Sequence, residues 1–146
     1  MKKAKDFFTE EELKAIVSSI KEAEKQTSGE IRLYIEDGSK AEPLDRAAFI
    51  FEELEMHKTE QRNGVLIYLA IAHKKFAILG DAGMHQLVHE TFWDEIKAKM
   101  LLHFKKGNFK SGLQEGIYLI GETLKVKFPY HNEDKNELPD EIVFGE

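Results

Sequence analysis

The segment VLIYLAI, residues 65–71, constrains the fold of this chain more than any other feature. Its residues are almost all apolar and rich in β-branched and aromatic side chains, which is typical of a strand buried on both faces. A turn near His73–Lys74 leads into a second apolar run, residues 76–79. The two runs are predicted to form an antiparallel hairpin whose first strand lies in the middle of a sheet.

Residues 30–36, EIRLYIE, alternate polar and apolar side chains, as expected for a strand with one face more buried than the other. Between this strand and the central one, an amphipathic helix is predicted to begin at Pro43. A strand, a crossover helix and a second strand in one sheet most often form a βαβ unit with parallel strands. The sequence therefore predicts an α/β fold with a mixed sheet.

Three further helices are predicted, so that about four helices flank the sheet. The first begins after Thr9, because Thr9 and Glu12 have the spacing of a capping box. The second begins near residues 90–91 and ends before Gly107, and the third spans about residues 109–127 with a regular apolar stripe.

The 146 residues have the length of one domain. We predict that residues 1–128 form it and that residues 129–146 are an acidic tail, either mobile or docked in extended form. A net charge of −6 argues against a general nucleic-acid partner, and no run reaches the roughly 18 apolar residues of a membrane span. The first residues lack the apolar run of a secretory signal, so we expect a cytoplasmic protein unless a leader has been removed.

Three polar strand ends meet at one edge of the sheet in this topology. Glu30 begins the first strand, Asn63 precedes the second, and Asp81 follows the third. Their carboxylate and amide oxygens are the ligands that Ca²⁺ and Mg²⁺ prefer. Because the chain has no cysteine, any metal must bind to oxygen or imidazole. We therefore predict a divalent-cation site at this edge.

Further residues of the predicted site have supporting roles. Asp94 is a candidate fourth ligand, although the dipole of the helix that it begins explains an acid there equally well. Arg62 is predicted to hold an anionic oxygen, such as that of a phosphate on a metal-bound ligand. Gly64, Gly80 and Gly83 are predicted to let the backbone approach a ligand closely.

Other interpretations of the same residues remain open. Asn-Gly and Gly-Asp-Ala-Gly are common in turns that bind nothing. Glu36 and Asp37 form an alternative acidic pair at the opposite edge, which would remain if the first two strands were antiparallel. His85 and His89 have the spacing for one helix face, but HQLVH lacks the adjacent Glu of a zincin motif. No residue can be assigned a catalytic role from the sequence.

Several short motifs occur in a defined order along the chain. They are FTEEE at the first helix, TSGEI and RNGVLI at the starts of two strands, a glycine closing the third strand, and GNF followed by GL at the last helix: residues 8–12, 27–31, 62–67, 80, 107–109 and 112–113. As an ordered set, they resemble the TPM domain family over about residues 5–128.

The resemblance implies a Rossmann-like αβα sandwich that binds a divalent cation in a surface crevice. A similar plant protein is associated with acid phosphatase activity, and many relatives are exported or anchored to membranes. The family loop is commonly Gly-Tyr-Gly-Leu/Ile-Glu, whereas this chain has Gly80-Asp81-Ala82-Gly83 and then Met-His. Only the first glycine matches, so the role of Asp81 is inferred from its position and chemistry.

Three hypotheses about function follow. The first is a Ca²⁺- or Mg²⁺-binding domain with a binding or accessory role. The second, implied by the resemblance, is a metal-assisted acid phosphatase that acts on phosphomonoesters, with a phosphorylated small molecule or protein as partner. The third is an interaction module whose tail, particularly Ile142–Phe144, docks on a partner or on the domain itself.

Overall fold

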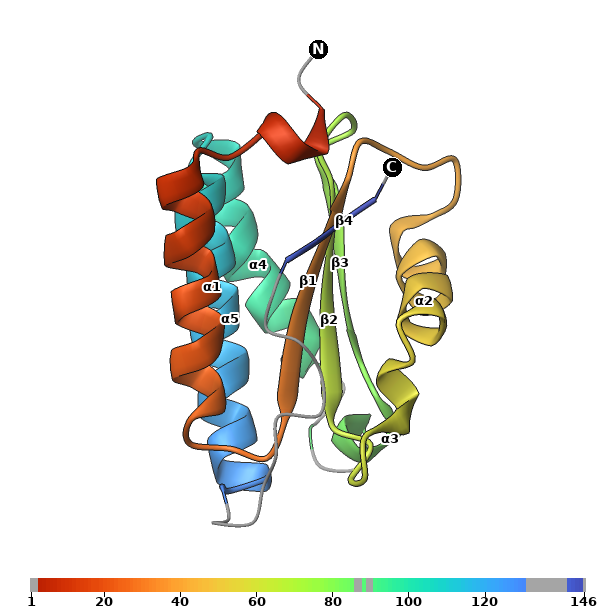
Figure 1. Cartoon of the computed structure of the whole chain (residues 1–146), viewed down its shortest axis with the longest axis vertical. Coiled ribbons are helices and arrows are strands. Elements are labelled where there is room, and N and C mark those ends of the chain that lie inside the picture. The colour runs from red at the N-terminus through yellow and green to blue at the C-terminus, as the bar shows by residue number, and fades with distance from the viewer. Residues whose placement is uncertain (1–2, 86–87, 89–90, 131–141, 146) are drawn as a thin grey trace.

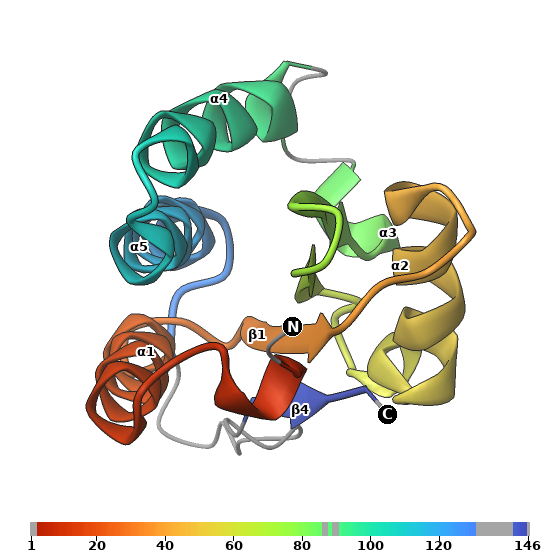
Figure 2. The same cartoon turned by 90° about the horizontal axis from the view of Figure 1, so that it is seen from above.

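The computed structural model describes residues 3–85, 88, 91–130 and 142–145. Within them, four strands form one sheet with helices on both of its faces (Figures 1 and 2). The predicted α/β sandwich with a mixed sheet is confirmed.

The sheet has the strand order β3-β2-β1-β4. The strands are β1 (Glu30–Glu36), β2 (Gly64–Ala70), β3 (Lys75–Gly80) and β4 (Val143–Phe144). β1 is parallel to both of its neighbours, β2 and β4, whereas β2 and β3 are antiparallel. The βαβ unit and the hairpin are therefore both present as predicted, and β2 is fully buried between its two neighbours.

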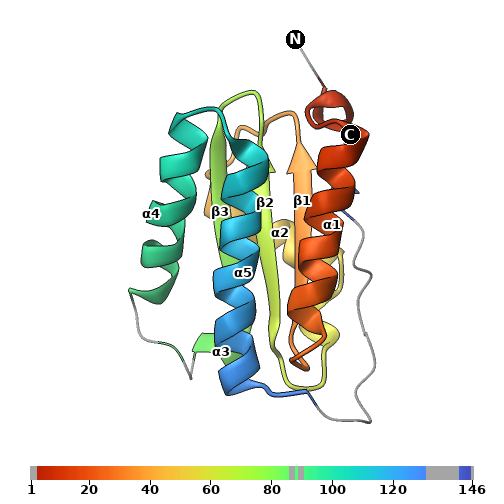
Figure 3. The same cartoon turned by 90° about the vertical axis from the view of Figure 1, so that its left-hand side faces the viewer.

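Helices α1 (Glu10–Glu24), α4 (Phe92–Lys105) and α5 (Phe109–Lys127) cover one face of the sheet, and α2 (Pro43–Glu53) covers the other (Figure 3). Each face has its own hydrophobic core. Because the side chains of a strand alternate between faces, Leu33 and Ile67 pack on the α1–α5 side, whereas Leu66 and Tyr68 pack on the α2 side.

Local sequence signals place several helix ends correctly. The Thr9 hydroxyl accepts a hydrogen bond from Glu12 N at 3.1 Å, and the Glu12 carboxylate accepts one from Thr9 N at 3.0 Å. This is the predicted capping box. Pro43 occupies the first turn of α2, where its missing N–H costs no helical hydrogen bond.

Three short helical segments were not predicted from the sequence. They are α3 (Ala82–His85) and two 3₁₀ turns, η1 (Ala4–Asp6) and η2 (Met56–Lys58). Each is too short to show a hydrophobic period. Burial of one side chain anchors each of them, namely Met84, Ala4 and Met56.

The end of the chain returns to the sheet. Val143 and Phe144 form β4, with Val143 opposite Tyr34 and Phe144 opposite Ile35. Ile142 and Phe144 also pack against the core on the α1–α5 side. The predicted tail thus contributes a short edge strand, whereas the predicted domain boundary at residue 128 stays a prediction because residues 131–141 lie outside the described part.

No helix in the described ranges has both the length and the apolar character needed to cross a lipid bilayer.

Candidate functional site

The parallel pairing of β1 and β2 brings the predicted polar strand ends together. β1 and β2 begin, and β3 ends, at the end of the sheet where α3 lies (Figure 1). Glu30 N donates to the carbonyl of Asn63 at 3.4 Å, and Asp81 N donates to the carbonyl of Gly64 at 2.9 Å. Glu30, Arg62, Asn63, Gly64, Gly80 and Asp81 are called the polar edge below.

The two acids of the polar edge lie on opposite sides of Gly64, because β2 runs between β1 and β3. Two strand spacings separate their Cα positions, a distance of about 10 Å. Strand alternation places Glu30 on the same face as Tyr34, and Asp81 on the same face as Leu79, and both of these partners pack on the α2 side. The two carboxylates therefore belong to the same side of the sheet, whereas the same alternation places Asn63 on the other side, with Val65.

Three polar side chains of this edge are buried. The exposed fraction is 3% for Glu30, 1% for Asn63 and 6% for Asp81. Burial of polar groups costs free energy unless partners compensate for the lost water. This arrangement therefore needs a structural or functional reason.

Asn63 has an uncompensated atom. Its backbone N–H donates to the Thr59 hydroxyl at 3.2 Å, and its Nδ2 donates to the Ser28 hydroxyl at 3.4 Å. Its Oδ1 is buried and has no hydrogen-bond partner among the described residues. A buried amide oxygen without a donor is unfavourable by about 1–3 kcal/mol, and a cation or another donor at that position would remove this cost.

Asp81 is held by Arg62 in a two-point ion pair. Arg62 Nε lies 2.7 Å from Oδ2, and Nη2 lies 2.8 Å from Oδ1, which also accepts from Ala82 N at 2.7 Å. Hydrogen bonding to the Asp81 carboxylate raises the pKa of Arg62. The guanidinium predicted to bind an external anion thus pairs with a predicted metal ligand, and its side chain is 50% exposed.

The glycines at this edge have packing reasons for lacking a side chain. A Cβ on Gly83 would lie 2.3 Å from the carbonyl oxygen of Gln61, and one on Gly80 would lie 2.4 Å from the Trp93 ring. A Cβ on Gly64 would lie 3.3 Å from the carbonyl oxygen of Met56. The absence of a side chain at Gly64 therefore lets the Met56 carbonyl oxygen lie close to Gly64, between the two acids. The predicted contact of Gly64, Gly80 and Gly83 with a ligand stays a prediction.

Asp94 lies in the first turn of α4 and not on a strand end. It lines a hollow of about 420 Å³ beside β3, together with Gly80, Trp93 and Lys97. In the described ranges, no hydrogen bond or ion pair joins Asp94 to the other predicted ligands. Its role as a fourth ligand stays a prediction.

The alternative acidic pair at the opposite edge has structural partners. Arg46 binds both oxygens of Glu36 at 2.9 Å, and the Tyr68 hydroxyl donates to the same carboxylate. Burial, followed by the effect of Glu36, raises the pKa of Tyr68. Asp37 accepts from Ala4 N at 2.6 Å. These acids therefore stabilise the fold around η1 and α2.

In the described part of the chain, the histidines do not add a group of metal-binding side chains. His85 ends α3, whereas His89 lies outside the described residues. Among residues 3–85, 88, 91–130 and 142–145, no group of three or more histidine, aspartate and glutamate side chains is placed to hold a metal ion. A cation at the polar edge would consequently depend on amide and backbone oxygens and on water besides the two carboxylates.

Comparisons with known proteins identify relatives of this chain. A family model for the TPM domain matches residues 1–123. A search of curated proteins found no match. Among solved structures, the chain is similar to the BA42 protein from the psychrophilic bacterium Bizionia argentinensis. The two are 46% identical, with a TM-score of 0.91 and coverage of 99% of this chain and 100% of that one.

Two more distant structures share the fold. The N-terminal domain of a protein from P. gingivalis is 16% identical, with a TM-score of 0.68 and coverage of 87% of this chain and 83% of that one. The N-terminal domain of a protein from Corynebacterium glutamicum is 9% identical, with a TM-score of 0.65 and coverage of 80% and 74%. At these identities the likeness concerns the fold alone.

Proposed function

Because the chain belongs to the TPM domain family, we propose that it is a divalent-cation-binding domain with a binding or accessory role, and that Ca²⁺ or Mg²⁺ binds at the polar edge. The observation that carries the proposal is the burial of the Glu30 and Asp81 carboxylates on one side of the sheet, at the end where Asn63 has a buried Oδ1 without a hydrogen-bond partner among the described residues. Glu30 and Asp81 lie at the same strand ends and supply negative charge.

The donor set suits a hard cation. Carboxylate, amide and backbone oxygens are the usual ligands of Ca²⁺ and Mg²⁺, and Mg²⁺ in particular retains several waters when few protein ligands are available. Two carboxylates with retained water would therefore suffice for a partly hydrated ion. The Asn63 amide, which belongs to the other side of the sheet, would reach it only beyond the strand ends. The Met56 carbonyl close to Gly64 offers a further oxygen of the same kind.

Arg62 competes with the cation in this proposal. Its guanidinium contacts both oxygens of Asp81, and its positive charge repels a divalent ion. Because the side chain is half-exposed, it can turn into solvent when the ion binds. Once released, Arg62 is available for an anionic partner of the bound cation.

Substituting Asp81→Asn is expected to weaken Ca²⁺ and Mg²⁺ binding by about tenfold or more, because the site loses one of its two negative charges. Titration of the wild type, followed by amide NMR shifts, should affect residues 29–30, 63–64 and 80–83. Asp37→Asn is the matched control, since it removes a carboxylate at the opposite end of the sheet. Shifts confined to residues 36–38, or equal affinity of the two variants, would refute the proposed site.

Substituting Arg62→Gln is expected to strengthen cation binding several-fold, because it removes the competing charge and releases the Asp81 carboxylate. Isothermal titration calorimetry at low and high ionic strength measures this effect, and salt should diminish the difference between variant and wild type. Lys58→Gln is the control, since Lys58 of η2 forms an exposed ion pair with Glu55, the residue before η2. A weaker affinity in Arg62→Gln would contradict the competition.

A second candidate function is metal-assisted hydrolysis of phosphomonoesters. The half-exposed guanidinium of Arg62 beside the proposed cation supports this function. Arginine binds two oxygens of a phosphate in the same two-point geometry that it uses to bind a carboxylate. A bound cation would polarise the phosphoryl group and lower the pKa of a bound water. This candidate ranks second because no described contact at the polar edge sets up a nucleophile or a general base.

Hydrolysis of p-nitrophenyl phosphate with Mg²⁺ separates the two functions. The phosphatase hypothesis expects activity that Asp81→Asn abolishes and Asp37→Asn retains. Cation binding without hydrolysis would support the accessory role. Hydrolysis that survives Asp81→Asn unchanged would place the chemistry elsewhere.

A further inference from the structure

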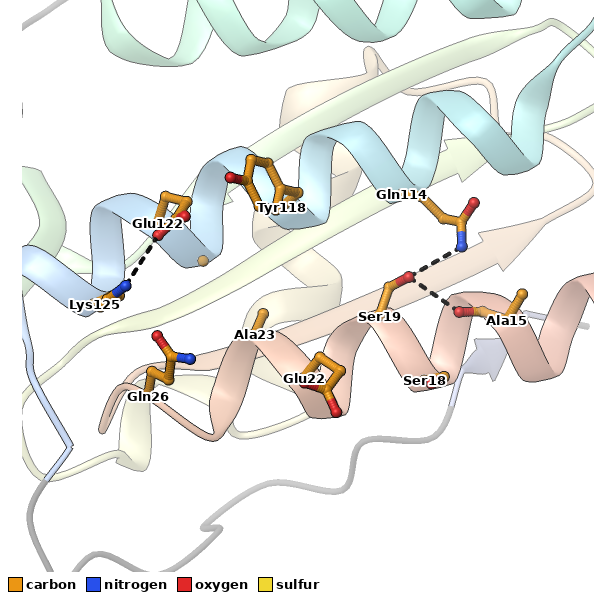
Figure 4. A pocket seen from close by; sticks show the side chains of 11 residues that line it. Ala15, Ser18, Ser19, Glu22, Ala23, Gln26, Gln114, Tyr118, Glu122 and Lys125 are labelled. Carbon is orange, nitrogen blue, oxygen red and sulfur yellow. Dashed lines mark hydrogen bonds and ion pairs between the residues drawn. The ribbon is translucent and has the colours of Figure 1, made fainter.

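A hollow of about 450 Å³ lies between α1 and α5 (Figure 4). Ser18, Ser19 and Gln26 of α1, with Gln114, Tyr118 and Gly121 of α5, belong to its lining. We call it the α1–α5 groove. Its volume lies within the range of about 300–1,000 Å³ that is typical of small-molecule sites.

The floor of the groove is formed by small residues. A Cβ on Gly121 would lie 2.7 Å from the Cβ of Ala23, so the two helices come close together at this point. Short side chains above a close helix contact leave room that longer side chains would fill. The resulting floor is apolar and narrow.

The walls of the groove offer neutral polar groups. Gln114 Nε2 donates to the Ser19 hydroxyl at 3.1 Å, and this hydroxyl donates to the Ala15 carbonyl at 3.1 Å (Figure 4). This chain of hydrogen bonds orients the Gln114 amide. Gln26 contributes a second amide from the other helix, and Ser18 a second hydroxyl. Amides and hydroxyls both donate and accept hydrogen bonds.

The charged groups of the groove do not favour an anion. Glu122 pairs with Lys125 at 3.8 Å, and Glu22 pairs with Lys25 at 2.7 Å. The two carboxylates of the lining are thus balanced by two ammonium groups, that of Lys125 in the lining and that of Lys25 beside it. Because both ammonium groups already pair with carboxylates, a phosphorylated molecule would have to displace one of these ion pairs.

Tyr118 provides an aromatic surface at the groove. Its side chain lies on α5 between Gln114 and Glu122 (Figure 4) and is 62% exposed. Hydrogen bonding to Glu122 raises the pKa of Tyr118. A neutral aromatic ring combines an apolar face with a polar tip.

We propose that the α1–α5 groove binds a small, neutral, polyhydroxylated molecule of the monosaccharide or disaccharide class. The vicinal hydroxyls of such a molecule need groups that both donate and accept hydrogen bonds. The amides and the serine hydroxyls supply such groups. Its C–H faces need apolar surface, which Tyr118 and the small-residue floor supply. The lining of this groove shares no residue with the polar edge.

Amide NMR titration with glucose and with maltose tests the proposal, and inorganic phosphate serves as the anionic comparison. Saturable shifts confined to residues 15–26 and 114–125 are expected with at least one sugar. Tyr118→Ala is expected to weaken that binding by about tenfold. Because Tyr118 is largely exposed, the variant should fold. Phe49→Ala, which removes an aromatic side chain that is 56% exposed on α2, is the matched control.

Three results would overturn the proposal. They are the absence of saturable shifts with both sugars, stronger binding of phosphate than of either sugar at these residues, and equal sugar affinity in Tyr118→Ala and Phe49→Ala. The experiment is carried out without divalent cations. Its outcome is therefore independent of the proposed cation site.

Discussion

Substituting Arg46→Ala is expected to lower the free energy of unfolding by about 3–5 kcal/mol. Arg46 is the cationic partner of Glu36, whose side chain is only 5% exposed. Loss of the guanidinium leaves a buried carboxylate with only the Tyr68 hydroxyl as a described side-chain donor. An unpaired buried charge is among the most destabilising changes a single substitution can make. Urea denaturation of the variant and the wild type measures the difference.

Two control variants identify the cause of this loss. Lys58→Ala breaks an exposed ion pair with Glu55 at 3.0 Å, and it should change the stability by less than about 1 kcal/mol. The double variant Arg46→Met with Glu36→Gln removes both charges and retains an acceptor for the Tyr68 hydroxyl. It should recover most of the lost stability. A double variant as unstable as Arg46→Ala would show that packing, and not the unpaired charge, is responsible.

Substituting Gly83→Ala is expected to lower the free energy of unfolding by about 2–3 kcal/mol and to weaken cation binding. The new methyl group would lie 2.3 Å from the carbonyl oxygen of Gln61 and 2.6 Å from that of Arg62. Because both atoms belong to the backbone, no side-chain rotation relieves the clash. The segment that carries Asp81 must shift instead. Thermal unfolding and a Ca²⁺ titration measure the two effects.

Gly38→Ala is the control for the Gly83→Ala substitution. The nearest atoms to its new methyl group belong to the His73 side chain, at 2.9 Å. A side chain can move aside, so the expected destabilisation is below about 1 kcal/mol. Unchanged stability and cation affinity in Gly83→Ala would show that the contact between α3 and the start of β2 is looser than the structure describes.

Where local chemistry alone decides, the elements were predictable. Thr9 caps α1, Pro43 begins α2 and residues 109–127 form α5, because each signal lies within one or two turns of the helix it specifies. The apolar run at residues 65–71 indicated a central strand for a similar reason. Periodicity is a property of neighbouring residues, so it requires no knowledge of the rest of the fold.

The placement of Glu30 and Asp81 at the same end of the sheet is predictable for another reason. A strand, a helix and a second strand almost always form a parallel pair, and a short turn almost always forms a hairpin. These two rules fix which strand ends share an edge. They do not fix side-chain contacts, so the ion pair between Arg62 and Asp81 is visible only in the structure.

The sequence by itself thus determined the order and direction of the main elements, and with them the end of the sheet where the polar residues gather. Only the tertiary structure decided which of these residues bind each other. Arg46 pairs with Glu36 across ten residues, and Gln114 reaches Ser19 from a helix far along the chain. Such pairs depend on the relative placement of elements, which arises when two separate cores pack on the two faces of one sheet.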